Sequence, residues 1–269
     1  MQKTQVFALL LTLTAKEVRE IRKFLRSPFF NQREDVVALF DFLMANIQKG
    51  KYDLPKEKVF KKVYRHLPFE EQAFRQLLSW LQQLIEKYLT QQAFFEDPLE
   101  AKIRLAAVFR DRDLPRHFQK AVRDAERRLD GIPYRNADYY QRRYDLEHEK
   151  YVAASIQRTT SRNFQSIADN LDLAHILKKL QQVCLIVAHQ TVYRADHELG
   201  MFKEILSYID QKGLTENPTV DTYLNCYRAL TNPEREDYFF RFRNLLVQNA
   251  DRFSLDELRN LYLLAINFC

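Results

Sequence analysis

The sequence predicts an all-α protein. Apolar residues recur at three- and four-residue steps through most of the chain, which is the period of an amphipathic helix. Only four glycines occur in 269 residues, whereas sheet proteins and nucleotide-binding folds need glycine for turns and close backbone approach. Helix starts are marked by capping residues and by proline at the first helical position. Helices joined by short loops account for all three observations.

Four helices are expected in an N-terminal helical unit, 1–95. They run from Thr14 to before Pro28, from Asn31 to Gly50, from 55 to 64 and from 70 to 95. Thr14 and Glu17 have capping-box spacing, and Asn31 is expected to cap the second helix. A helix-turn-helix reader of DNA over 55–90 is a weaker alternative, because a recognition helix needs a polar outer face and this one is densely apolar.

The stretch 171–193 is expected to be the central core helix of the rest of the chain. Its apolar residues follow the helix period: Leu173, Ile176, Leu177, Leu180, Val183, Cys184 and Val187. The six residues 183–188 are apolar without a break, so neighbouring helices should cover this helix on nearly all sides. The run is too short for a membrane span, which needs about 20 residues.

From residue 96 to 269 the helix entries become regular. Entries are expected at Asp97, Leu114, Asn136, Asp172, Asn217, Asn232 and Ser254. Alternate entries lie roughly 36 to 38 residues apart, which is the window of helix-pair repeats. In period and pairing this region resembles the tetratricopeptide-like α-solenoids. The resemblance implies an irregular stack of helix pairs; a closed bundle fits the same periodicity.

Two further features concern the ends of the chain. The segment Arg26-Ser27-Pro28-Phe29-Phe30-Asn31 makes the N-terminal part similar to uncharacterised bacterial helical proteins, a resemblance that implies no activity. The chain stops at Cys269 inside an amphipathic pattern that includes Phe268. We therefore hypothesise that the sequence is part of a longer repeat protein.

Motifs of several enzyme classes are missing from the sequence. The four glycines cannot form a phosphate-binding loop or a GxSxG nucleophile elbow. The HExxH pattern of zinc proteases fails because Val152 stands where the second histidine would follow His148. Asp145 with His148, and Asp172 with His175, have the spacing of paired metal ligands on one helix face. Chance supplies such pairs in this composition, so a metal-dependent bundle enzyme is only a remote alternative, and no cofactor is expected.

Cysteine usage indicates a reducing compartment. The three cysteines at 184, 226 and 269 form no metal-ligand pair and cannot all pair with one another. The apolar run Val6 to Leu11 after Lys3 would suit a secretory signal, but bulky Leu13 stands at the small-residue position of a cleavage site. We expect a cytoplasmic protein without a membrane segment.

The charge map is the strongest functional signal. The segment 102–162 carries 15 basic and 9 acidic residues, and 12 of the basic ones are arginine, which suits bidentate contact with carboxylate or phosphate. The expected binding residues are Arg116, Lys120, Arg123, Arg127, Arg135, Tyr139, Arg142 and Arg143. The first four form a stripe opposite the apolar face of their helix, and the others interleave cations with aromatic rings.

Three interpretations of this surface remain open. Lys120 with Asp124, and Asp124 with Arg128, could be pairs on an ordinary solvated helix face. Tyrosine and arginine together are also typical of protein interfaces and of surfaces that bind RNA or single-stranded nucleic acid. We expect a non-enzymatic scaffold that binds an acidic protein segment or helix, with nucleic-acid binding as the alternative.

Overall fold

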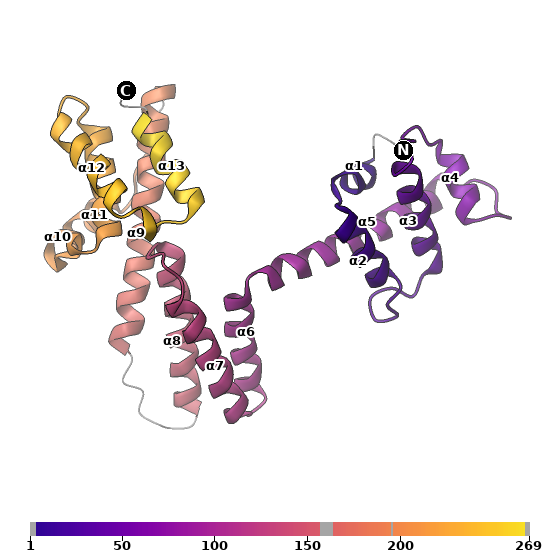
Figure 1. Ribbon diagram of the computed structural model, residues 1–269, viewed down its shortest axis with the longest axis horizontal. Coiled ribbons are helices and arrows are strands. Elements are labelled where there is room, and N and C mark those ends of the chain that lie inside the picture. The colour runs from indigo at the N-terminus through magenta and orange to yellow at the C-terminus, as the bar shows by residue number, and fades with distance from the viewer. Residues whose placement is uncertain (1–3, 157–163, 195, 267–269) are drawn as a thin grey trace. The chain divides into compact units, whose positions relative to one another are not determined.

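The computed structural model describes residues 4–156, 164–194 and 196–266. Within these ranges the chain forms thirteen α-helices and two 3₁₀ turns, without a strand (Figure 1). The predicted all-α class is confirmed. The helices gather into two compact units, Met1–Pro98 (unit 1) and Leu99–Cys269 (unit 2).

Unit 1 is built around its longest helix. Its elements are α1 (Gln5–Thr12), α2 (Ala15–Leu25), α3 (Glu34–Ile47), α4 (Lys56–Val63) and α5 (Glu71–Glu96). Helices α1, α2 and α3 each pack against α5, and α4 packs against α3. The face of α5 that carries Phe74, Leu77 and Leu81 is fully buried in their shared core. That burial excludes this face of α5 from reading DNA bases.

Two helix-start predictions in unit 1 have different outcomes. The capping box at Thr14 is confirmed: its backbone N–H donates to Glu17 at 2.7 Å, and the Glu17 N–H donates to the Thr14 hydroxyl at 3.2 Å. The hydrogen bonds from Thr14 hold the pKa of Glu17 below its usual value. The prediction for Asn31 is wrong, because α3 begins at Glu34 and the Asn31 amide instead donates to the carbonyls of Leu25 at the end of α2 and of Arg33.

The apolar run near the N-terminus forms a helix that was not expected. Helix α1 places Val6, Phe7 and Leu10 in the core of unit 1. Thr4 caps it, with its hydroxyl accepting from the Phe7 N–H at 3.4 Å. Half of the run that would suit a secretory signal therefore lies in the folded core, whereas its last residue, Leu11, is 51% exposed. None of the described helices is long and apolar enough to cross a membrane.

Unit 2 contains the remaining helices. They are α6 (Pro98–Asp111), α7 (Pro115–Asp130), α8 (Ala137–Ile156), α9 (Phe164–Tyr193), α10 (Phe202–Lys212), α11 (Pro218–Thr231), α12 (Glu236–Gln248) and α13 (Leu255–Ile266), with 3₁₀ turns η1 (Leu214–Glu216) and η2 (Ala250–Arg252). Helices α6 and α7 share one apolar cluster with the middle of α8. Helices α9 to α13 share another with the start of α8. Helix α8 thus belongs to both clusters.

Helix α11 is the most completely buried helix of unit 2. All eight residues from Thr219 to Cys226 on α11 are buried, and α9, α12 and α13 pack around it. Helix α9 buries the predicted apolar face, but it starts earlier, at Phe164, and its Leu185 is 47% exposed. Its neighbours cover one side of α9 rather than nearly all sides.

Two predicted helix entries in this region are wrong. Asp172 lies inside α9, and α12 begins at Glu236 rather than directly after Asn232. The entries at Asn136, Asn217 and Ser254 are confirmed. The predicted spacings that use Asp172 and Asn232 therefore do not connect helix starts.

The start of α8 is fastened to distant parts of unit 2. Asn136 caps α8 by accepting from the Tyr139 N–H at 3.0 Å, and its amide donates to the buried Glu257 of α13 at 2.6 Å. The Arg135 N–H donates to the Arg252 carbonyl at 2.9 Å. These bonds fix where the arginines and tyrosines of α8 lie.

Candidate binding surface

Helix α7 presents the predicted basic stripe to solvent. Pro115 occupies its first turn, where a missing backbone N–H costs nothing. Arg116, Lys120, Arg123 and Arg127 are all exposed. At about 100° per residue they fall within an arc of roughly 60°, opposite the buried face. That face consists of Phe118, Ala121, Val122, Ala125 and Leu129.

The cations of this stripe form few ion pairs within the protein. Among the residues that the structure describes, Arg116, Lys120 and Arg123 form no ion pair, and Arg127 reaches Asp124 only at 3.9 Å. The predicted pairs of Asp124 with Lys120 and Arg128 are not formed. The interpretation of this surface as an ordinary solvated helix face, with ion pairs along one helix, therefore loses its main support.

The acidic residues of α7 instead form ion pairs with the neighbouring helices α6 and α8. Asp124 pairs with Lys102 of α6 at 3.6 Å. On the other side, Glu126 pairs with Lys150 of α8 at 3.0 Å, and Asp130 pairs with Arg143 of α8 at 3.3 Å. Since these are the three acidic residues of α7, the outward stripe retains its positive charge.

The other members of the predicted surface, Arg135 just before α8 and Tyr139, Arg142 and Arg143 on it, are half-buried and engaged inside unit 2. The Arg135 guanidinium donates to the carbonyls of Ile132 and Tyr134 at 2.5 and 2.7 Å and lies 4.3 Å from the Tyr139 ring centre. Tyr139 packs against the cluster shared by α6, α7 and α8. Arg142 is also half-buried and interacts within the chain.

Arg143 belongs to a charged cluster around Glu147, which sequence reasoning missed. Glu147 is buried and accepts from Lys150 at 3.0 Å, with Arg143 at 3.9 Å. Burial disfavours the charge of Lys150, but its hydrogen bonds to Glu147 and Glu126 outweigh that effect and raise its pKa. The spacing of Arg143, Glu147 and Lys150 at four and three residues was the available signal.

The predicted eight-residue surface is therefore two regions rather than one. We call the four exposed cations Arg116, Lys120, Arg123 and Arg127 the α7 stripe. The predicted stretch 102–162 also contains Arg158 and Arg162, which lie outside the described residues, as does Phe268 of the C-terminal pattern.

The candidate metal-ligand pairs have other partners. Asp145 accepts from Gln141 at 3.1 Å, and Asp172 accepts from the Tyr208 hydroxyl at 2.6 Å. The His148 ring stacks on Tyr144 with centres 5.7 Å apart. Within the described ranges, no three His, Cys, Asp or Glu side chains gather as metal ligands would.

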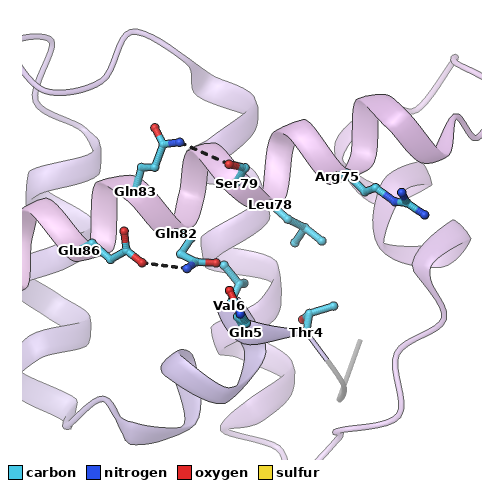
Figure 2. Close-up of a pocket in the computed structure, with 9 residues that line it drawn as sticks. All are labelled: Thr4, Gln5, Val6, Arg75, Leu78, Ser79, Gln82, Gln83 and Glu86. Atoms are coloured by element: carbon cyan, nitrogen blue, oxygen red, sulfur yellow. Dashed lines mark hydrogen bonds between the residues drawn. The ribbon is translucent and has the colours of Figure 1, made fainter.

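A hollow of about 470 Å³ lies in unit 1 between the start of α1 and α5 (Figure 2). The polar side chains of α5 along it bond to one another: Gln82 donates to Glu86 at 2.8 Å, and Gln83 donates to Ser79 at 3.3 Å. Arg75 at the far end is also paired within α5. Because these groups are satisfied within one helix, they do not converge on a ligand position.

Comparison with known proteins adds no assignment. No protein-family model matches the chain, and neither a curated protein nor a solved structure matches it. The function has to be argued from the surface itself.

Proposed function

We propose that the chain is a non-enzymatic interaction scaffold that binds an acidic protein segment through the α7 stripe. The observation that carries the proposal is the sideways pairing of Asp124, Glu126 and Asp130 with α6 and α8. The helix thereby keeps a row of largely unpaired cations on its solvent face. Such a row attracts a partner of opposite charge and supplies orientation and association rate more than affinity.

An acidic helix fits the stripe better than a nucleic acid. The stripe spans residues 116–127, or about 16 Å along the helix axis, and its four-three-four spacing matches that of one face of a partner helix. Recognition of single-stranded nucleic acid also uses exposed aromatic rings on which bases stack. The neighbouring Tyr139 and Tyr140 of α8 are instead packed into the clusters of unit 2.

We infer further that unit 2 is an irregular solenoid of helix pairs, similar in arrangement to the tetratricopeptide-like class. Consecutive helices that pack side by side, α8 with α9 and α11 with α12, support this proposal. A cytoplasmic location belongs to the same proposal, and the free buried thiols of Cys184 and Cys226 are consistent with a reducing compartment.

The test is a binding titration by fluorescence anisotropy with a labelled helical peptide whose glutamates follow the four-three-four spacing. A scrambled peptide of the same composition and a single-stranded RNA serve as comparison probes. Four exposed ion pairs at about 0.5 kcal/mol each give about 2 kcal/mol. Replacing all four cations of the α7 stripe by alanine should therefore weaken peptide binding roughly thirtyfold.

The matched control removes four exposed cations from unit 1 instead: Lys58, Lys61, Lys62 and Arg65, each to alanine. It should leave peptide binding unchanged, although it lowers the net charge by the same amount. Equal loss in both variants would reduce the effect to net charge and overturn the proposal. Stronger binding to RNA, with a log-log salt slope of several units, would favour the nucleic-acid alternative.

A further inference from the structure

Helix α4 carries cations on the side that faces away from the core of unit 1. Val59 and Phe60 are buried, and Val63 packs against the same core. The opposite side carries three exposed lysines, which fall within an arc of roughly 100° at about 100° per residue. An exposed arginine lies two residues beyond the helix. We call these four cations the α4 face: Lys58, Lys61, Lys62 and Arg65.

The cations of the α4 face are not paired with carboxylates. Among the residues that the structure describes, none of the four forms an ion pair, whereas Lys56 at the start of the helix pairs with Glu71 at 2.8 Å. The only acidic residue in the segment 56–69 is Glu57. Because no carboxylate neutralises it, the α4 face attracts an anionic partner.

The turn after α4 exposes three consecutive apolar residues, Leu67, Pro68 and Phe69. Leu67 is 58% exposed and Phe69 36%. The rings of Tyr64 and Phe69 both contact the Phe60 ring of α4, with centres 4.8 and 5.4 Å apart. The Leu67 N–H donates to the Tyr64 carbonyl at 3.4 Å. Both ends of the turn therefore rest against α4, and Leu67 lies between them at the tip.

Helices α3 and α5 hold this turn in place. The Tyr64 hydroxyl donates to Asp35 of α3. The Phe69 ring packs against the buried Phe74 of α5, with centres 6.0 Å apart. Because the turn is tied at both ends, the exposure of Leu67 is built into the fold. Its burial against a partner would cost little conformational entropy.

Unpaired cations beside exposed apolar side chains fit a lipid surface that carries negative charge. Anionic headgroups attract lysines close to the membrane, and apolar side chains enter the boundary between headgroups and acyl chains. A nucleic acid fits this region less well. Its bases stack on exposed aromatic faces, and the aliphatic Leu67 offers none. Arginine is the residue suited to bidentate phosphate contacts, whereas three of the four cations here are lysines.

We propose that unit 1 attaches to anionic membrane surfaces through the α4 face and the turn after it. The four cations contact the lipid headgroups, and Leu67 and Phe69 enter the layer just below them. The attachment is peripheral, because the helix itself keeps its apolar side in the core of unit 1. This proposal is independent of the function proposed for the α7 stripe, which lies in unit 2.

The test is co-sedimentation of the full chain with vesicles of phosphatidylglycerol and phosphatidylcholine in equal parts, and with vesicles of phosphatidylcholine alone. The wild-type protein should bind the anionic vesicles only, and added salt should weaken binding by screening the charges. Replacing the four cations of the α4 face by alanine should weaken binding at least about tenfold. Leu67→Ala leaves the charge unchanged and should weaken binding about fivefold.

Two matched variants in unit 2 separate this face from net charge and from general apolar adhesion. The fourfold alanine variant of the α7 stripe removes the same charge and should leave vesicle binding unchanged. Leu255→Ala removes an apolar side chain that is 80% exposed, and it should also have no effect.

Four results would overturn the proposal. They are equal binding to both kinds of vesicle, equal losses in the two fourfold variants, wild-type binding by Leu67→Ala, and tighter binding of a single-stranded RNA through the α4 face. The last result would assign the face to nucleic acid. Every replaced side chain is exposed, so the variants should keep the helical circular dichroism of the wild-type protein.

Discussion

Helices α7 and α8 are neighbours that both carry several cations, yet these cations have different environments. On α7 the cations point to solvent and the acids pair sideways with Lys102, Lys150 and Arg143. On α8 and at Arg135 just before it, the cations are half-buried, and those with described partners interact with carbonyls, carboxylates and a ring of the same unit. The comparison teaches that arginine content does not locate a binding surface. The partners that neighbouring helices supply decide which cations stay available.

The positions of the two helices in unit 2 explain the difference. Helix α8 packs against both α7 and α9, so it has neighbours on two sides. Helix α7 shares an apolar cluster with α6 and α8 on one face, and its opposite face meets no described helix. Side chains on a helix between two others are drawn into contacts, whereas those on the outer face of an edge helix are left to solvent.

Of the substitutions that distinguish α7 from α8, one on the buried side of α8 should change the free energy of unfolding most. Leu146 is fully buried in the cluster with α6 and α7. Leu146→Ala should lower the free energy of unfolding by about 3 kcal/mol, through lost burial and the cavity left behind. Urea unfolding followed by circular dichroism measures it. Arg123→Ala on the α7 stripe is the control and should change the free energy of unfolding by less than about 0.5 kcal/mol. An equal loss in the two variants would contradict the proposed difference between the two helices.

A smaller loss is expected at the buried acid of α8. Glu147→Gln keeps the shape of the side chain but removes the charge that holds Lys150 and Arg143. We expect a loss of about 1 to 2 kcal/mol, because Lys150 stays partly buried with one carboxylate fewer. Glu126→Gln is the control on the α7 side and should cost less, since Glu126 is more exposed. A larger effect at Glu126 would contradict the assignment of Glu147 as the centre of the cluster.

Geometry rather than charge should matter at Arg135. A lysine there keeps the positive charge but loses the guanidinium whose Nη1 donates to two carbonyls and whose carbon lies 4.3 Å from the Tyr139 ring centre. Arg135→Lys should cost about 1 kcal/mol in urea unfolding. The same exchange at Arg123 should have no measurable effect. If both variants unfold like the wild type, Arg135 at the entry to α8 contributes no more to stability than a cation of the α7 stripe.

The smallest effect is a pH dependence at Asp145 on α8. Burial raises the pKa of this carboxyl above its ordinary 3.8, against the opposing hydrogen bond from Gln141. The folded state therefore binds this proton more tightly than the unfolded chain, and the cost of the charged form appears as pH rises through the folded pKa. Asp145→Asn should raise the melting temperature slightly at neutral pH. The difference should vanish in acid below the ordinary pKa; a constant difference at all pH values would exclude titration as its cause.

Much of the local structure could be predicted because its causes are local. The capping boxes at Thr14 and Ser254, the long helix α5 and the apolar face of α7 follow from spacings of three and four residues. The missed features depend on distant neighbours. Helix α11 is buried although it carries Thr219, Asp221, Thr222 and Asn225, and a polar sequence does not predict a central helix.

The polar residues of α11 are tolerated because several find partners nearby. The Thr222 hydroxyl donates to the Pro218 carbonyl at 2.7 Å. The Asn225 amide donates to the carboxylate of Asp221 at 2.7 Å, and Arg241 of α12 approaches the same carboxylate at 3.3 Å. A buried polar group is acceptable when it is hydrogen-bonded. Apolar content therefore pointed to α9, whereas the full burial of α11 depends on how its neighbours pack against it.

The sequence by itself determined that the chain is helical, where most helices begin, and that four cations lie opposite the apolar face of α7. Only the tertiary structure decided which charges are already paired. Glu126 finds Lys150 and Arg110 finds Glu149 across separations of 24 and 39 residues. Helix periodicity acts over a few residues and orients each side chain on its own helix, whereas compensation of charge depends on which other helices fold against it.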